Sequence, residues 1–160
     1  MHAHGFLYHS IAGQPADVRD AVIEQLRSWA GDAEPAPDCR RMTAGEIRAA
    51  ASGGLSMGAH TVRHLCLPQQ PFDVQVTEIA ASREALERIA GIPIRAFAYP
   101  FGAFDDVSAR AVREAGMEWA FTCDARCLTW RDDPLHLPRV EIQEPAPRRF
   151  ASRVERAFGS

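Results

Sequence analysis

From residue 55 onward, short apolar runs alternate with amphipathic segments, and this alternation decides the class of fold. The predicted strands are Leu55–Ala59, Ile94–Tyr99 and Trp119–Cys123. Between them lie a stretch from Phe72 to Gly91, whose apolar residues share one helical stripe, and a second one over 105–116. Strand, helix, strand, helix, strand is the order of a parallel sheet with helical crossovers. The pattern therefore predicts an α/β fold.

Two further helices are predicted before the first strand. One begins at residue 15 and places four apolar residues at helical spacing. The other begins at a capping box, in which Thr43 accepts from a backbone N–H and Glu46 reaches back, and it stops at Gly53. Residues 31–42, rich in Pro and Asp, indicate a loop between the two helices. The four apolar residues of the first helix are Val18, Val22, Leu26 and Trp29.

The chain has 160 residues, which is enough for one domain with a sizeable core. We divide it into a helix and loop over 1–42, a core over 43–142 and a terminal helix over 143–160. Within the core, the run LPRVEI, which begins at Leu137, predicts one more short strand. Four cysteines are too few for a disulfide scaffold of this size, so free thiols are expected.

The composition narrows the classes of partner. Apolar residues make up 46% of the chain and charged residues 24%, as in globular proteins. Because 18 basic residues face 21 acidic ones and no basic block stands out, neither a nucleic-acid partner nor a membrane-surface partner is expected. No apolar run approaches the roughly 20 residues of a membrane span. The start, MHAHGFLYHS, lacks the features of a signal peptide, so the chain as it stands is expected in the cytoplasm. A missing N-terminal part would leave the compartment open.

Chemically suggestive residues follow each of the three predicted strands. His60 and His64 follow the first, Tyr99 to Gly102 the second, and Cys123 to Cys127 the third. The carboxyl ends of parallel strands meet at one edge of a sheet, where sites gather. Two imidazoles suit zinc, cobalt or nickel. The alternative is that they only solvate a polar turn.

The runs GAHTVRH and FAYPFG, some thirty residues apart, resemble motifs of the polysaccharide deacetylase family. These are metal-dependent carbohydrate esterases that include chitin and peptidoglycan deacetylases. The resemblance covers residues 43–142, the C-terminal part of the family's domain, and the preceding helix resembles an insertion seen in bacterial members. It implies that His60 and His64 are ligands of a divalent metal, most simply zinc. It also implies that the N–H of Phe101 stabilises an oxyanion, and that Tyr99, Pro100 and Phe101 line a groove for sugar.

The chain departs from the family pattern in its acidic residues. The family carries an apolar strand ending in Thr-Phe-Asp-Asp-Gly, which supplies a base and a further metal ligand, and no such run precedes residue 43. The pair Asp105-Asp106 better suits a helix N-cap, and Asp132-Asp133 lies in a polar turn. The resemblance therefore implies a partial distorted (β/α) barrel without its first β/α unit. His136 is the candidate acid, with a surface or packing role as the alternative.

Several other residues have competing interpretations. A closed His/Cys zinc site could form from His64 with the cysteines at 66, 123 and 127, although the spacing is not that of a common zinc module. Asp124 suits a solvated turn and Arg139 a structural ion pair. Three histidines near the start could bind metal adventitiously. They are His2, His4 and His9.

Two functional hypotheses follow from the resemblance. The first is a metal-dependent deacetylase of an N-acetylated oligosaccharide or polysaccharide, with weak or absent activity as an isolated chain because the Asp-Asp element is missing. The second is a truncated, non-catalytic domain that binds carbohydrate or protein. An unpaired sheet edge invites pairing with another chain. A homodimer, or a partner chain that covers this edge, is therefore expected.

Overall fold

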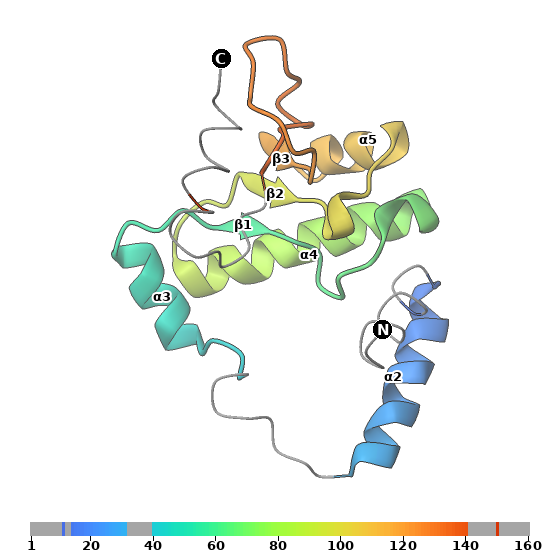
Figure 1. Cartoon of the computed structure of the whole chain (residues 1–160). Coiled ribbons are helices and arrows are strands. Elements are labelled where there is room, and N and C mark those ends of the chain that lie inside the picture. Colours follow the sequence, from blue (N-terminus) through green and yellow to red (C-terminus); the bar gives the residue numbers. More distant parts are fainter. Residues whose placement is uncertain (1–10, 12–13, 32–39, 141–149, 151–160) are drawn as a thin grey trace.

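The computed structural model describes residues 11, 14–31, 40–140 and 150 (Figure 1). Within these residues three short strands form a parallel sheet in the order β1-β2-β3. Helices precede and separate the strands, which confirms the predicted α/β class. The elements are α2 (Ala16–Ala30), α3 (Ala44–Ser52), β1 (Gly58–Ala59), η2 (Leu67–Gln69), α4 (Phe72–Ala90), β2 (Ala96–Ala98), η3 (Pro100–Gly102), α5 (Asp106–Glu114) and β3 (Trp119–Phe121).

The strands lie where the sequence predicts them but are shorter. β1 begins at Gly58 rather than Leu55, because Leu55 is exposed and follows directly on the helix end at Gly53-Gly54. In the segment LPRVEI, the described residues give only a parallel bridge between Leu137 and Phe121. The prediction of a partial barrel stays a prediction, and the predicted terminal helix over 143–160 lies outside the described residues apart from position 150.

The core lies on the face of the sheet that packs against α4 and α5. Ala59, Phe97 and Ala120 are aligned neighbours on the three strands, and all three are buried. They pack in one cluster with Ile79 of α4 and Val112 of α5. Alternate residues of a strand point to opposite faces, so the positions on either side of these three face away from the core. The opposite face of the sheet therefore carries the side chains of these flanking strand residues and is not part of the core.

Helix α4 has the bounds and the ending that its sequence predicts. It runs for 19 residues, and Gly91 follows it in the left-handed conformation with φ of 73°. The Gly91 N–H donates to the Glu87 carbonyl and closes the helix. The N-cap of α5 is also as predicted, because the Asp105 side chain accepts from the Ser108 N–H at 2.7 Å.

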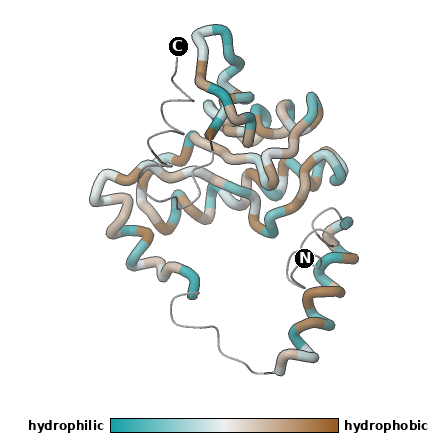
Figure 2. The backbone as a smooth tube through the Cα atoms, in the orientation of Figure 1, coloured by the Kyte–Doolittle hydropathy of each residue, from teal (hydrophilic) through white to brown (hydrophobic). Residues whose placement is uncertain are grey.

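Helix α2 forms as predicted, but its apolar stripe is not what packs against the rest of the chain. Val18 and Trp29 are 43% and 74% exposed. The buried residue of α2 is instead Arg19, whose guanidinium donates to the His64 carbonyl at 2.9 Å. Figure 2 shows hydrophobic positions spread along this helix. No helix of the described residues is long and apolar enough to cross a membrane.

The capping box of α3 gives a prediction about pH. Ion pairing with Arg40, and then hydrogen bonds from Thr43, lower the pKa of Glu46 to about 2. A carboxyl whose pKa falls on folding contributes stability that is fully present above its unfolded pKa of about 4.3 and lost as the pH falls through 2. We expect Glu46→Gln, which mimics the protonated acid, to be less stable than the wild type at pH 7. The difference should close between pH 5 and 2, as measured by urea unfolding at each pH.

A constant difference between Glu46→Gln and the wild type across that range would contradict this account of the capping box. Other carboxyls with lowered pKa, such as Asp105, affect the stability of both proteins alike, so comparing the variant with the wild type isolates the effect of Glu46.

Candidate active site

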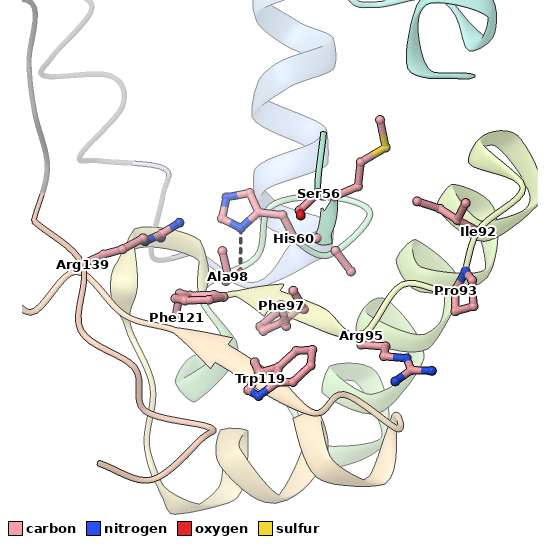
Figure 3. A pocket seen from close by; sticks show the side chains of 14 residues that line it. Ser56, His60, Ile92, Pro93, Arg95, Phe97, Ala98, Trp119, Phe121 and Arg139 are labelled. Carbon is pink, nitrogen blue, oxygen red and sulfur yellow. Dashed lines mark hydrogen bonds between the residues drawn. The ribbon is translucent and has the colours of Figure 1, made fainter. Parts of the chain in front are cut away.

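The first histidine of the pair is fixed by a contact with the neighbouring strand. His60 follows β1 directly, and its Nδ1 lies 2.7 Å from the carbonyl oxygen of Ala98, the last residue of β2 (Figure 3). A carbonyl only accepts hydrogen bonds, so Nδ1 carries the proton. In the neutral ring Nε2 then holds the lone pair. The side chain is exposed, which leaves this nitrogen open to a ligand.

The second histidine lies against the first. The ring centroids of His60 and His64 are 4.7 Å apart in an edge-to-face arrangement. Burial of the His64 ring, followed by the charge of His60, lowers the pKa of His64. Both effects disfavour the imidazolium form, so His64 is neutral at neutral pH. A neutral imidazole is the form that binds a metal ion.

The turn after β2 brings a third predicted residue to the pair. The ring of Phe101 lies 4.5 Å from that of His64, centroid to centroid. Phe101 has φ of 61°, a left-handed conformation that gives the sharp turn expected of an oxyanion donor. The turn is closed by the Gly102 N–H, which donates to the Tyr99 carbonyl at 2.9 Å. The structure thus gathers His60, His64 and Phe101 at the carboxyl ends of β1 and β2.

Two residues predicted to line a sugar groove lie in the core instead. Tyr99 is 1% exposed, and its hydroxyl donates to the Leu135 carbonyl at 3.1 Å. Pro100 is also fully buried. A side chain with so little exposed surface has none to offer a ligand, so Phe101 alone of the three lies half-exposed beside the histidines.

His136 occupies a separate aromatic cluster. Its ring stacks at 4.5 Å on Phe104, which in turn lies 5.2 Å from the Tyr99 ring. Its Nε2 is buried and has no hydrogen-bond partner among the described residues. This position agrees with a packing role, because the His136 ring contacts Phe104 rather than His60 or His64.

The remaining candidates have structural roles in the described residues. The Asp124 carbonyl accepts from the N–H groups of Arg126 and Arg139, as in a turn. The Arg139 guanidinium donates to the Thr122 carbonyl and lies over the Phe121 ring. Burial and the charge of Asp105 raise the pKa of the Cys66 thiol, which disfavours the thiolate that a metal needs.

The donor set for a metal is incomplete within residues 14–31 and 40–140. No three His, Cys, Asp or Glu side chains gather there in a way that could hold an ion. The closed His/Cys site considered from the sequence is therefore not formed by these residues. The imidazoles of His60 and His64 fit a metal in donor type and proximity, but as two ligands that need a third.

A cavity of about 600 Å³ adjoins His60 on the face of the sheet away from α4 and α5 (Figure 3). Strand residues that point away from the core, Trp119 and Phe121 among them, form its floor. Arg95 and Arg139 lie at its margins. The hollow is thus mainly apolar with cationic groups at the rim.

The fold and site together define a parallel α/β protein with paired histidines and a sharp turn at the carboxyl edge of its sheet. The family model described as polysaccharide deacetylase matches residues 1–120. The chain therefore belongs to the polysaccharide deacetylase family. The resemblance in the sequence motifs covers residues 43–142. The family model also matches the residues before 43, but its match ends at residue 120.

Solved structures agree with this assignment. The Streptococcus pyogenes deacetylase PplD, in complex with acetate, is 25% identical with a TM-score of 0.62, over 66% of this chain and 47% of that one. BC0361, a polysaccharide deacetylase from Bacillus cereus, is 25% identical with a TM-score of 0.65, over 89% of this chain and 48% of that one. The chain spans about half the length of these structures. No curated protein matches it.

Sequence reasoning missed the residues that hold the loop from His60 to His64, which we call the histidine loop. The Glu78 carboxylate on α4 accepts from the N–H groups of Val62 and Arg63. A pattern in the sequence could have revealed it, because polar side chains share the inward stripe of α4 with Ile79 at spacings of three and four residues. Those polar residues are Gln75, Glu78 and Ser82.

Proposed function

We propose that this chain carries part of the site of a metal-dependent deacetylase, which hydrolyses the acetamide of an N-acetylated carbohydrate. The observation that carries the proposal is the neighbouring pair His60 and His64, whose ring centroids lie 4.7 Å apart at the carboxyl edge of the sheet. Membership of the polysaccharide deacetylase family supports it. The substrate class comes from the family and is part of the proposal.

Each residue at the site has a proposed task. His60, through Nε2, and His64 would hold a divalent ion, most simply zinc. Such an ion, when bound, supplies a water of lowered pKa and polarises the acetamide carbonyl. The N–H of Phe101, which lies at a left-handed turn, would donate to the oxyanion that develops on that carbonyl. His136 remains the proposed acid for the leaving amine, although its described contacts are with aromatic rings.

The incomplete donor set leads us to propose low activity for the isolated chain. We propose that a third ligand and a base come from outside the described residues, or from another polypeptide. β1 lies at one edge of the described sheet, so we also propose that a second copy or a partner chain pairs with this edge. The alternative function is a non-catalytic domain that binds carbohydrate or protein, and the same incomplete donor set favours it.

Acetate release from N-acetylated chitooligosaccharides tests the proposal. We expect slow release that rises when zinc is added and stops with a chelator, because hydrolysis depends on the ion held by His60 and His64. The measurement is acetate formed per mole of chain, with His60→Ala/His64→Ala as the control. Binding of the oligosaccharide without metal-dependent release would instead support the non-catalytic alternative.

A further inference from the structure

The loop that carries both histidines has a conformation that needs support. Thr61 and His64 have φ of 59° and 56°, in the left-handed region. This region is unfavourable for residues other than glycine, and more so for a β-branched residue such as Thr61. Backbone strain of this kind persists where surrounding contacts over-determine the conformation. Contacts from α4 and α2 supply that support here.

The strongest of these contacts come from Glu78. Its Oε2 accepts from two successive backbone groups, the Val62 N–H at 3.0 Å and the Arg63 N–H at 2.9 Å. Its Oε1 accepts from Arg63 Nε at 2.8 Å. Glu78 is only 6% exposed, and burying a charged group is costly unless it is hydrogen-bonded. All three of these bonds go to the segment between the two histidines.

Ser82, one turn further along α4, binds the start of the same loop. Its Oγ accepts from the His60 N–H at 3.4 Å. Residues four apart lie on one face of a helix, so Glu78 and Ser82 both face the loop. α4 therefore binds the loop at its first residue and at its middle.

Arg19 of α2 binds the other end of the loop. It is 8% exposed, and it donates from a terminal guanidinium nitrogen to the His64 carbonyl at 2.9 Å. Asp20 beside it accepts from Arg63 at 3.2 Å. The C-terminal end of the loop, at His64, is thus held by α2, whereas the middle of the loop is held by α4.

We infer that Glu78 is a positioning residue for the imidazoles of His60 and His64, with Arg19 as its counterpart at the C-terminal end of the loop. The inference rests on the proposed function. Glu78 acts through the backbone. Its carboxylate fixes the N–H groups of the two residues before His64, and so determines how the backbone presents the His64 side chain. A glutamine keeps one acceptor oxygen but turns an amide N–H₂ toward Arg63, so the charge and the second acceptor are both lost.

Two measurements on Glu78→Gln test the inference. The first is zinc affinity by competition with a chromogenic chelator. We expect an affinity about 10–100-fold below the wild type, the usual effect of removing a group that orients metal ligands. The second, on the metal-free chain, is amide hydrogen exchange with NMR of the histidine rings. We expect the Val62 and Arg63 amides to lose protection at least about tenfold and the His64 ring signals to shift, while protection in β2 and α5 stays unchanged.

Glu84→Gln is the matched control, because Glu84 is an exposed glutamate on the same helix. If Glu78→Gln behaves like Glu84→Gln in both measurements, the inference is overturned. A wild-type chain that binds no zinc through His60 and His64 would defeat the proposed function, and exchange in the metal-free chain would then decide alone whether Glu78 holds the loop. Should Glu78→Gln fail to fold, Arg19→Met serves instead, and unchanged His64 ring signals in that variant would overturn the inference.

Discussion

Replacing His60 and His64 together by alanine is expected to lower the zinc affinity of the chain by more than about 100-fold, beyond what removing an orienting group usually costs. The two imidazoles are the neighbouring ligand pair that the structure offers, and the described residues hold no three-member cluster that could take over. The measurement is metal content of the purified protein and zinc affinity of the variant beside the wild type. Stability should change little, because His60 is exposed and His64 only half-buried.

Histidines elsewhere provide the controls for this prediction. His136→Ala should keep wild-type affinity, because that ring lies on Phe104. Replacing the terminal histidines at positions 2, 4 and 9 measures how much of the zinc affinity comes from adventitious binding. If the double variant at 60 and 64 still binds zinc as the wild type does, the histidine loop is not the metal site, and the deacetylase proposal loses its main support.

The features predicted well from the sequence are those that depend on neighbouring residues. The capping box of α3 and the left-handed Gly91 after α4 each satisfy backbone groups within one turn, so a short run of residues specifies them. The order of helices and strands follows from apolar periodicity for the same reason. Local signals of this kind fixed the α/β class and placed His60 and His64 at the carboxyl end of a strand.

The features that the sequence did not reveal depend on contacts between distant residues. The tautomer of His60 is set by Ala98, 38 positions away. Tyr99 was expected in a sugar groove, but its hydroxyl finds the Leu135 carbonyl and its ring is buried. The burial of Arg19 on a helix with an apolar stripe depends on the His64 carbonyl, 45 positions away. Such partners are fixed only when the chain folds.

The turn that presents Phe101 depends on a glycine, and this leads to the second prediction of large effect. Gly102 has φ of 67°, and a Cβ placed there would lie 2.6 Å from the Cys123 Cβ and 2.8 Å from the Cys123 backbone nitrogen. We expect Gly102→Ala to destabilise the chain by about 2–4 kcal/mol, because left-handed strain adds to overpacking against a backbone atom that cannot rotate away. The measurement is the free energy of unfolding in urea.

Gly91→Ala separates the two causes. Gly91 also has a positive φ, 73°, but a Cβ there would meet no atom within 4 Å. Its substitution should therefore cost only the conformational part, about 1–2 kcal/mol. Equal losses for the two variants would show that the approach of Gly102 to Cys123 contributes nothing. A larger loss at Gly102 would mean that the segment after β3, at Cys123, packs directly against the turn after β2, which is the turn that carries the proposed oxyanion donor Phe101.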